Sequence, residues 1–459
     1  MVLSCAMLID GIDQTVLATS IPQMAQSLGE SPIRLNFAIT SYYLSLAIFI
    51  PVSGWIADRF GARSVFCTAV AVFTIGSALC GAATSLPVLV LTRVIQGLGG
   101  AMMVPVGRLV LLKSFDKSEL VAAMSFVSIP ALVGDASGPL IGGFLTTYAS
   151  WRWIFYVNVP FGILGILLAA RYFENYRREG ITRFDFFGFT LCGIGLAAMA
   201  LALEYAGRHF VSNAAETGLV ALASVCLLSY GLYARRVPNP AVDLNIFRIK
   251  TFKIGVLGGF VCRTGLSSTS FLLPLLLQIP FGLSPFRSGL VTSVLALGSM
   301  VLKSISPPLF RRLGFRKILL WNTVLVAVMM MGLALLTSQT PRWALLLGLL
   351  VLGFFRSMQF SSMNTLSYSD VVGREISTAT SVAGVMQQLA AGFGVAISAA
   401  LLAQLTGNGG VPTQADFSLA FMAMAMFPLA TVVWFNRLTP EDGCHVSGYR
   451  PQKHRLEEA

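Results

Sequence analysis

Long apolar runs recur along the whole chain and constrain its fold more than any other feature. Each run is long enough to cross a hydrocarbon core about 30 Å thick as a helix, which needs about 20 residues. Only 11% of the 459 residues are charged, against roughly 25% in a typical soluble protein. The runs are continuous rather than alternating, which excludes a membrane β-barrel. The sequence therefore predicts an all-α integral membrane protein with fourteen transmembrane helices, at about residues 2–26, 36–56, 65–84, 87–112, 120–147, 152–172, 186–205, 216–234, 252–278, 285–308, 317–337, 342–367, 376–404 and 417–436.

The positive charges are sorted between the two sets of predicted loops. If the N-terminus is cytoplasmic, 22 of the 32 Lys and Arg residues fall in cytoplasmic loops and the C-terminal tail. The opposite loops hold only Arg34, Arg152, Arg208, Arg287 and Arg342. Membrane proteins carry such an excess of Lys and Arg in their cytoplasmic loops. The sorting indicates that both termini are cytoplasmic, and it assigns the net charge of +12 to membrane topology rather than to nucleic-acid binding.

A short internal repeat predicts two related halves. The pattern Arg-x-Gly-x-Arg follows the second predicted span, within Gly54–Arg63, and the tenth, within Leu309–Lys317. Chance similarity between two short basic loops is the alternative. Secondary transporters are commonly built from repeats with the ligand site between them. We therefore predict an N-terminal six-helix bundle over residues 1–178, an inserted helix pair over 179–240, a C-terminal six-helix bundle over 241–440 and a cytoplasmic tail over 441–459.

The residue types that hold metals or nucleotides form no pattern here. The seven cysteines show no CxxC spacing, and the three histidines form no cluster with Cys or carboxylates. No phosphate-binding GxxxxGK[ST] loop is present, so we expect an ion gradient rather than ATP to supply energy. The first apolar run carries Asp10 and Asp13 and lacks a basic leader. We therefore expect it to be a retained helix rather than a cleaved signal peptide.

Several ordered segments resemble signatures of the major facilitator superfamily. Gly54–Arg63 resembles its loop signature, Arg93–Ala101 its fourth-helix motif and Gly134–Gly143 its fifth-helix antiporter motif. Asp13–Val16 and Trp151–Pro160 are typical of the fourteen-span drug:proton antiporter branch. Three further segments are similar to one group of transporters within that branch: Met24–Pro32, Gly99–Arg108 and Ser361–Thr365. The resemblance covers nearly the whole chain and implies the major facilitator fold and a proton-coupled exporter in a bacterial inner membrane.

The loop signature implies a cytoplasmic gate that holds the outward-facing state. The residues of this gate motif are Gly54, Asp58, Arg59, Gly61 and Arg63. We expect Gly54 to let two helices approach closely, and Asp58 to accept hydrogen bonds from Arg side chains and helix N-termini. A plain positively charged loop without a gating role is the alternative.

The fifth-helix motif combines glycines four residues apart with a proline. Its residues are Gly134, Gly138, Pro139, Gly142 and Gly143. The glycines thin one helix face, and Pro139 removes a backbone hydrogen bond and kinks the helix. The resemblance implies antiport, whereas ordinary close packing of helices is the alternative. Asp135 departs from the family pattern, in which a small or apolar residue stands at this position.

Four charged residues are candidates for proton coupling: Asp10, Asp13, Arg93 and Asp135. A carboxylate at a helix centre costs roughly 2.5–3.5 kcal/mol and persists where it faces a cavity or a cation. Asp13 matches the first-helix acid of the branch. Its i, i+3 spacing from Asp10 predicts both carboxyls on one face, where we expect one of them to hold a proton near neutral pH. The resemblance links Arg93 to proton transfer, with a snorkelling arginine as the alternative; for Asp135 a proton site and a constitutive ion pair remain equally open.

The predicted spans also hold candidate residues for a substrate cavity: Gln96, Arg263, Arg356 and Gln387. The bases inside predicted spans are Arg93, Arg108, Arg263, Lys303 and Arg356, and they outnumber the three deep acids. If these bases line the cavity, its potential is not strongly negative. The balance argues against a pump dedicated to dications and favours anionic, zwitterionic or neutral substrates.

Proton-coupled export of a drug or metabolite by alternating access is the function that these patterns favour. Uptake or facilitated diffusion of a small organic solute is the main alternative, and export of an anionic metabolite or metal chelate is another. A sensor would need a signalling domain that the short loops do not contain, and no nucleophile–base pair indicates an enzyme. We expect a monomer whose partners are a small-molecule substrate, protons and the lipid bilayer, without nucleic acid and without a cofactor.

Overall fold

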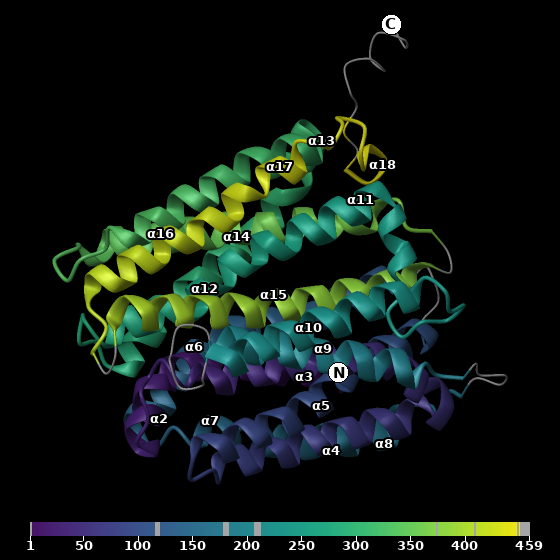
Figure 1. Ribbon diagram of the computed structural model, residues 1–459, viewed down its shortest axis with the longest axis horizontal. Coiled ribbons are helices and arrows are strands. Elements are labelled where there is room, and N and C mark those ends of the chain that lie inside the picture. The colour runs from purple at the N-terminus through teal and green to yellow at the C-terminus, as the bar shows by residue number, and fades with distance from the viewer. Residues whose placement is uncertain are drawn as a thin grey trace, which may run out of the picture.

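All secondary structure is helical in the part of the chain that the structure describes. A computed structural model describes residues 2–114, 120–177, 183–205, 213–372, 375–407, 410–447 and 449. Backbone N–H and C=O groups find no water in a lipid core and must bond within their own element, which favours helices. The long helices run side by side along the molecule (Figure 1). One end carries α2 and α7, and the other carries α11 and α18; we call these the α2 end and the α11 end.

The N-terminal half begins with a helix that is interrupted once. The helix over Val2–Val16 (α1) passes through a 3-10 turn at Leu17–Ser20 (η1) into Ile21–Leu28 (α2). The remaining helices of this half are α3 (Asn36–Phe60), α4 (Ala62–Gly81), α5 (Leu86–Ser114), α6 (Leu120–Tyr148), α7 (Trp153–Tyr156) and α8 (Asn158–Tyr172). Because α1 packs against α5, α6 and α8, its central residues lie inside this half.

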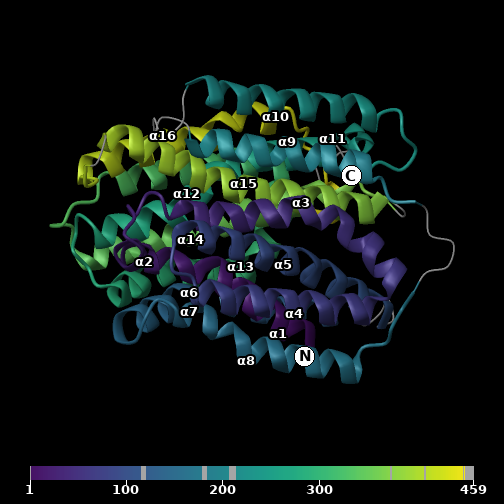
Figure 2. The ribbon, with the colours of Figure 1, turned by 60° about the horizontal axis from the view of Figure 1, so that its bottom comes forward.

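The C-terminal half follows an inserted pair of helices. This pair consists of α9 (Phe186–Tyr205) and α10 (Asn213–Ala234). The elements after it are η2 (Leu244–Arg248), α11 (Lys250–Lys253), a π-helical turn η3 (Ile254–Gly258), α12 (Gly259–Gln278), α13 (Pro285–Ala334), α14 (Arg342–Ser369), α15 (Glu375–Thr406), α16 (Gln414–Ala430), α17 (Val432–Phe435) and α18 (Cys444–Ser447). The two halves meet where α6 packs against α13 and α3 packs against α15. The helix α9 covers one side of this boundary by packing against both α3 and α15, and α10 covers α9 (Figure 2).

The predicted repeat corresponds to two glycines with the same unusual backbone conformation. Gly61 follows α3 with a φ of 95°, and Gly314 joins two helices within α13 with a φ of 69°. Residues other than glycine rarely adopt positive φ. The Arg-x-Gly-x-Arg pattern therefore has the same role in both halves: its glycine lets one membrane-length helix end and the next begin at once.

Twelve helices in the described residues are long and apolar enough to cross a membrane. Two helical segments are not among these twelve: α6, which has 29 residues, and the part of α13 that runs from Pro285 to the counted span beginning at Leu309. Side chains 112–128 and 301–308 are not described, so neither segment is fully assessed. The predicted total of fourteen stays a prediction.

Part of the charge sorting falls outside the described residues. The basic residues concerned are Lys117, Arg178, Arg208, Arg374, Arg450, Lys453 and Arg455, together with the side chains of Lys113 and Lys303. The predicted boundary between residues 178 and 179 and most of the predicted tail over 441–459 also lie outside them.

Candidate functional site

A fully buried ion pair lies in the middle of the N-terminal half. The Arg93 side chain on α5 donates from Nη1 to Oδ2 of Asp13 on α1, at 2.8 Å. Asp13 is 0% exposed and Arg93 is 1% exposed. A charge buried without a partner costs several kcal/mol, so each of these residues requires the other.

Two side-chain amides complete the hydrogen bonds of the Asp13 carboxylate. Gln96 donates from Nε2 to Oδ1 at 2.7 Å, and Asn158 at the start of α8 donates from Nδ2 to the same oxygen at 3.1 Å. Gln96 also accepts from Arg93 Nη1 at 2.8 Å, and Arg93 Nε donates to the Ala38 carbonyl at 3.0 Å. Four helices (α1, α3, α5 and α8) therefore fix the pair. In this closed network both oxygens of the Asp13 carboxylate accept hydrogen bonds from side chains of other helices.

Tyr42 connects this buried pair to a second acid. The Arg93 guanidinium lies over the Tyr42 ring, 4.3 Å from its centroid. The Tyr42 hydroxyl donates to Asp10 Oδ1 at 3.0 Å, and Gln14 donates to Asp10 Oδ2 at 2.9 Å. Unlike Asp13, Asp10 lines a large cavity. A continuous chain of contacts therefore runs from the cavity to the buried pair.

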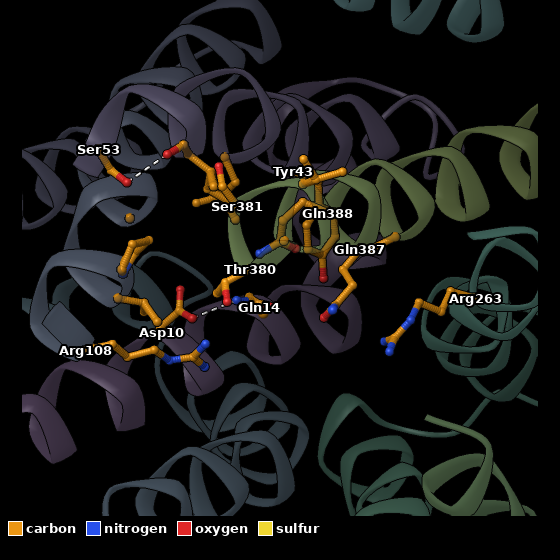
Figure 3. Close-up of a pocket in the computed structure, with 18 of the residues that line it drawn as sticks. Asp10, Gln14, Tyr43, Ser53, Arg108, Arg263, Thr380, Ser381, Gln387 and Gln388 are labelled. Atoms are coloured by element: carbon orange, nitrogen blue, oxygen red, sulfur yellow. Dashed lines mark hydrogen bonds between the residues drawn. The ribbon is translucent and has the colours of Figure 1, made fainter. Parts of the chain in front are cut away.

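The cavity has a volume of about 1740 Å³ and lies between the two halves. Its lining extends from Thr19 and Ile39 in the interior to Asp58, Asn239 and Ile376 at the α11 end. The helices α1, α3, α5, α6, α12, α13, α14 and α15 all contribute to the walls. Figure 3 shows Asp10, Gln14 and Arg108 on one side of the cavity and Arg263 with Gln387 on the other.

Direct contacts join the two halves near the α2 end. Gln278 of α12 donates to the Thr19 carbonyl at 2.9 Å, and the backbone N–H of Phe286 donates to Thr147 Oγ1 at 3.0 Å. The glycines of α6 allow this approach: a Cβ on Gly143 would collide with the Pro285 backbone. The cavity thus reaches the α11 end, and the halves touch near the α2 end.

The charges of the inner cavity are divided between its two walls. Asp10 on α1 and Asp135 on α6 belong to the N-terminal wall, together with Arg108 of α5. Arg263 on α12 and Arg356 on α14 belong to the C-terminal wall. Asp13 and Arg93 pair with each other outside the cavity, so the charged side chains described in its lining are these five together with Asp58, Arg183, Asp185 and Asp243. The predicted contribution of Lys303 lies outside the described side chains.

The two arginines of the C-terminal wall contact the same aromatic ring. The Arg263 guanidinium lies 4.5 Å from the Phe360 ring centroid, and that of Arg356 lies 5.4 Å from it. Arg263 Nη2 donates to Asn364 Oδ1 at 2.7 Å, and Gln387 donates to the same oxygen at 3.3 Å. Three of the predicted cavity residues (Arg263, Arg356 and Gln387) therefore lie together.

The gate motif lies at the open end of the cavity. Asp58 lines the cavity and, among the described residues, makes no hydrogen bond or ion pair. Arg59 lies 5.2 Å from the Trp55 ring centroid, and Arg63 is exposed. The expected close approach at Gly54 is wrong for this conformation: a Cβ there would meet nothing within 4 Å. The reason is that Gly54 faces the open cavity rather than a neighbouring helix.

The fifth-helix glycines lie against α1. A Cβ on Gly134, Gly138 or Gly142 would collide with Leu8, Thr15 or Val16, respectively. Small residues four apart let two helix backbones approach closely. The stripe therefore fixes α6 against the helix that carries Asp10 and Asp13. Pro139 lies within α6, and its carbonyl packs against Gly289 of α13.

One expectation about the site needs correction. Gln96 does not line the cavity, since its amide is used inside the Asp13 network. The expectation that Asp10 or Asp13 holds a proton stays a prediction, and the two acids have different surroundings: Asp13 is enclosed by Arg93 and two amides, whereas Asp10 faces the cavity. The helical spacing of the two acids is as expected, but packing gave them different surroundings.

Four residues of the site were not singled out from the sequence: Tyr42, Asn158, Phe360 and Asn364. For Asn158 and Asn364 a signal existed, since both lie inside segments that resemble family motifs, Trp151–Pro160 and Ser361–Thr365. Tyr42 and Phe360 are two of 43 Phe and Tyr residues, and nothing in the chain distinguishes them.

The described residues offer no obvious site for a metal. No group of three or more His, Cys, Asp or Glu side chains within them could hold a metal ion.

The chain belongs to the major facilitator superfamily. The family model described as "Major Facilitator Superfamily" matches residues 3–395 and, in a second match, residues 255–448. Solved structures share the fold at low sequence identity. A D-xylose-proton symporter has a TM-score of 0.70 at 16% identity, over 96% of this chain and 98% of that one. The nucleoside transporter NupG has a TM-score of 0.62 at 13% identity, over 95% and 96%.

Curated relatives show which members of this superfamily the chain is similar to. "Putative multidrug resistance protein MdtD" of Pectobacterium atrosepticum is 38% identical over 435 residues, 94% of this chain and 93% of that protein. The protein of the same name from Escherichia coli O17:K52:H18 is 40% identical over 438 residues, 94% of this chain and 92% of that one. The expected family is therefore confirmed. The chain is a multi-pass membrane transporter and not an enzyme.

Proposed function

We propose that the protein is a proton-coupled exporter, a drug or metabolite:proton antiporter that works by alternating access. The observation that carries this proposal is the buried Asp13–Arg93 pair, one helical turn from the cavity-lining Asp10. An intramembrane ionisable residue with a defined partner is by default a candidate functional site. The proton gradient is the proposed energy source, and no cofactor takes part.

The free energy needed to break the Asp13–Arg93 pair is similar to the free energy that one proton releases in crossing the membrane. Neutralising one partner of a buried pair leaves the other uncompensated, at a cost of about 3–5 kcal/mol. One proton crossing about 180 mV releases roughly 4 kcal/mol. A proton arriving at Asp13 therefore forces Arg93 to find another partner. We propose that Arg93 then moves toward Asp10, since Tyr42 contacts both of them.

The shape of the cavity supports alternating access. We assign the α11 end to the cytoplasm, because it carries the basic residues after α3 and within α13. The conformation is then inward-facing, and an Asp58 that has no hydrogen bond or ion pair among the described residues fits a gate motif that engages only in the outward-facing state. We further propose that α6 and the first part of α13 complete fourteen spans, with both termini cytoplasmic in a bacterial inner membrane.

Transport in proteoliposomes tests the proposal. Purified protein is reconstituted, a pH jump is applied, and movement of a chemically mixed panel of solutes is followed. We expect counterflow of substrate and protons, which Asp13→Asn abolishes. Asp416→Asn is the matched control, since Asp416 only caps the start of α16. Unchanged transport without a proton gradient, or by Asp13→Asn protein, would contradict antiport, and solute entering together with protons would indicate uptake.

A further inference from the structure

The C-terminal wall of the cavity holds two positive charges near one aromatic ring. Both guanidinium carbons contact the Phe360 ring, at 4.5 Å for Arg263 and 5.4 Å for Arg356. Two groups so close to one ring centre cannot be more than about 10 Å apart. Like charges at this separation repel each other, and the repulsion grows as the dielectric constant falls.

The protein supplies little to compensate these charges. Among the described residues, neither arginine forms a salt bridge with a carboxylate. The hydrogen bond of Arg263 goes to the neutral Asn364, at 2.7 Å, and that of Arg356 to Ser270, at 3.5 Å. The acid whose charge Arg356 senses, Asp135, belongs to the opposite wall. Arginines inside a membrane protein normally face a cavity or a partner, and here they face a cavity.

The acids of the opposite wall are already engaged. Asp10 accepts hydrogen bonds from Gln14 and Tyr42, and it also senses the charge of Arg108. Asp135 has partners within the protein as well. The charged groups that can still bind a ligand are therefore the two arginines, which favours a negative rather than a positive ligand.

We propose that Arg263, Arg356 and Phe360 form a carboxylate-binding subsite of the cavity. Its ligand is an organic anion whose carboxylate is held by the guanidinium groups and whose flat or apolar body lies on the Phe360 ring. Guanidinium groups match carboxylates in geometry as well as charge. Asn364 positions Arg263 and is in turn held by Gln387. This inference rests on the proposed function, because it names the class of substrate for that same cavity.

Three probes that share a phenyl ring and carry a negative, a neutral or a positive polar group test the subsite: benzoate, benzamide and benzylammonium. Each is titrated into the purified full-length protein at equilibrium, without a membrane gradient, and the dissociation constant is taken from the rise in melting temperature. We expect benzoate to bind and the other two probes to bind at least about tenfold more weakly, as for loss of a charged hydrogen bond.

Variants assign the binding to the named residues. Arg263→Gln and Arg356→Gln should each weaken benzoate binding about tenfold or more, and Phe360→Leu should weaken it less. Arg263→Lys keeps the charge and should retain part of the affinity, which separates loss of the site from misfolding. Arg342→Gln is the matched control, since Arg342 is exposed at the start of the same helix as Arg356. Benzoate affinity unchanged in Arg263→Gln and Arg356→Gln, or stronger binding of benzylammonium, would overturn the proposal.

Benzoate binding and proteoliposome transport, measured on the same variants, separate this inference from the antiport mechanism. Asp13→Asn leaves the arginines in place and should still bind benzoate while losing gradient-driven transport. In the wild-type protein, transport that does not depend on the proton gradient, together with intact benzoate binding, would reject antiport and keep the subsite. Proton-driven transport without any preference for benzoate would reject the subsite and keep antiport.

Discussion

A double-mutant cycle on Asp13 and Arg93 tests whether the buried pair is as interdependent as its geometry indicates. Asp13→Asn leaves the Arg93 guanidinium without its 2.8 Å carboxylate partner, and Arg93→Gln does the reverse. Each single change should lower the free energy of unfolding by about 3–5 kcal/mol. The double variant removes both charges and leaves amides that can bond to one another. It should therefore cost at least about 2 kcal/mol less than the two single changes added together.

Unfolding by graded SDS in mixed micelles, followed by circular dichroism, measures these free energies. Strict additivity of the two single costs would refute the reasoning, because it would mean that the two side chains do not depend on each other.

Two further predictions concern the groups around this pair. Tyr42→Phe keeps the ring beneath Arg93 but removes the 3.0 Å hydrogen bond to Asp10. We expect the free energy of unfolding to fall by only about 1 kcal/mol. We also expect the pH profile of proteoliposome transport to shift. Gly142→Val places a branched side chain against the Val16 backbone, so we expect a loss of about 3 kcal/mol or more, seen as a lower melting temperature.

Matched control variants test whether the two effects are specific to Tyr42 and Gly142. Tyr148→Phe alters an exposed tyrosine and should leave the pH profile unchanged. Gly218→Ala adds a methyl group where nothing lies within 4 Å and should leave the melting temperature unchanged or slightly raised. An unshifted profile for Tyr42→Phe would mean that Asp10 is not linked to the pair. An unaffected Gly142→Val protein would mean that α1 and α6 are not closely packed.

The sequence by itself determined the class of fold and the points where the chain must turn. Apolar runs of membrane length leave helices as the available structure, because unpaired backbone groups are too costly in lipid. Gly61 and Gly314 could be matched in advance, because their flanking arginines repeat and because residues other than glycine rarely adopt positive φ. The small-residue stripe of α6 was visible for the same reason: four-residue spacing repeats one helix face.

Only the tertiary structure decided which charged residues meet. Asp10 and Asp13 stand one turn apart on α1, yet one faces the cavity and the other is enclosed by α5 and α8. Arg263 and Arg356 come from helices far apart in the chain, and they meet at Phe360. Periodicity fixes the direction of a side chain relative to its own helix, whereas its neighbours depend on how that helix is rotated and packed. That choice is made by contacts such as Gly142 on Val16, which join residues more than a hundred positions apart.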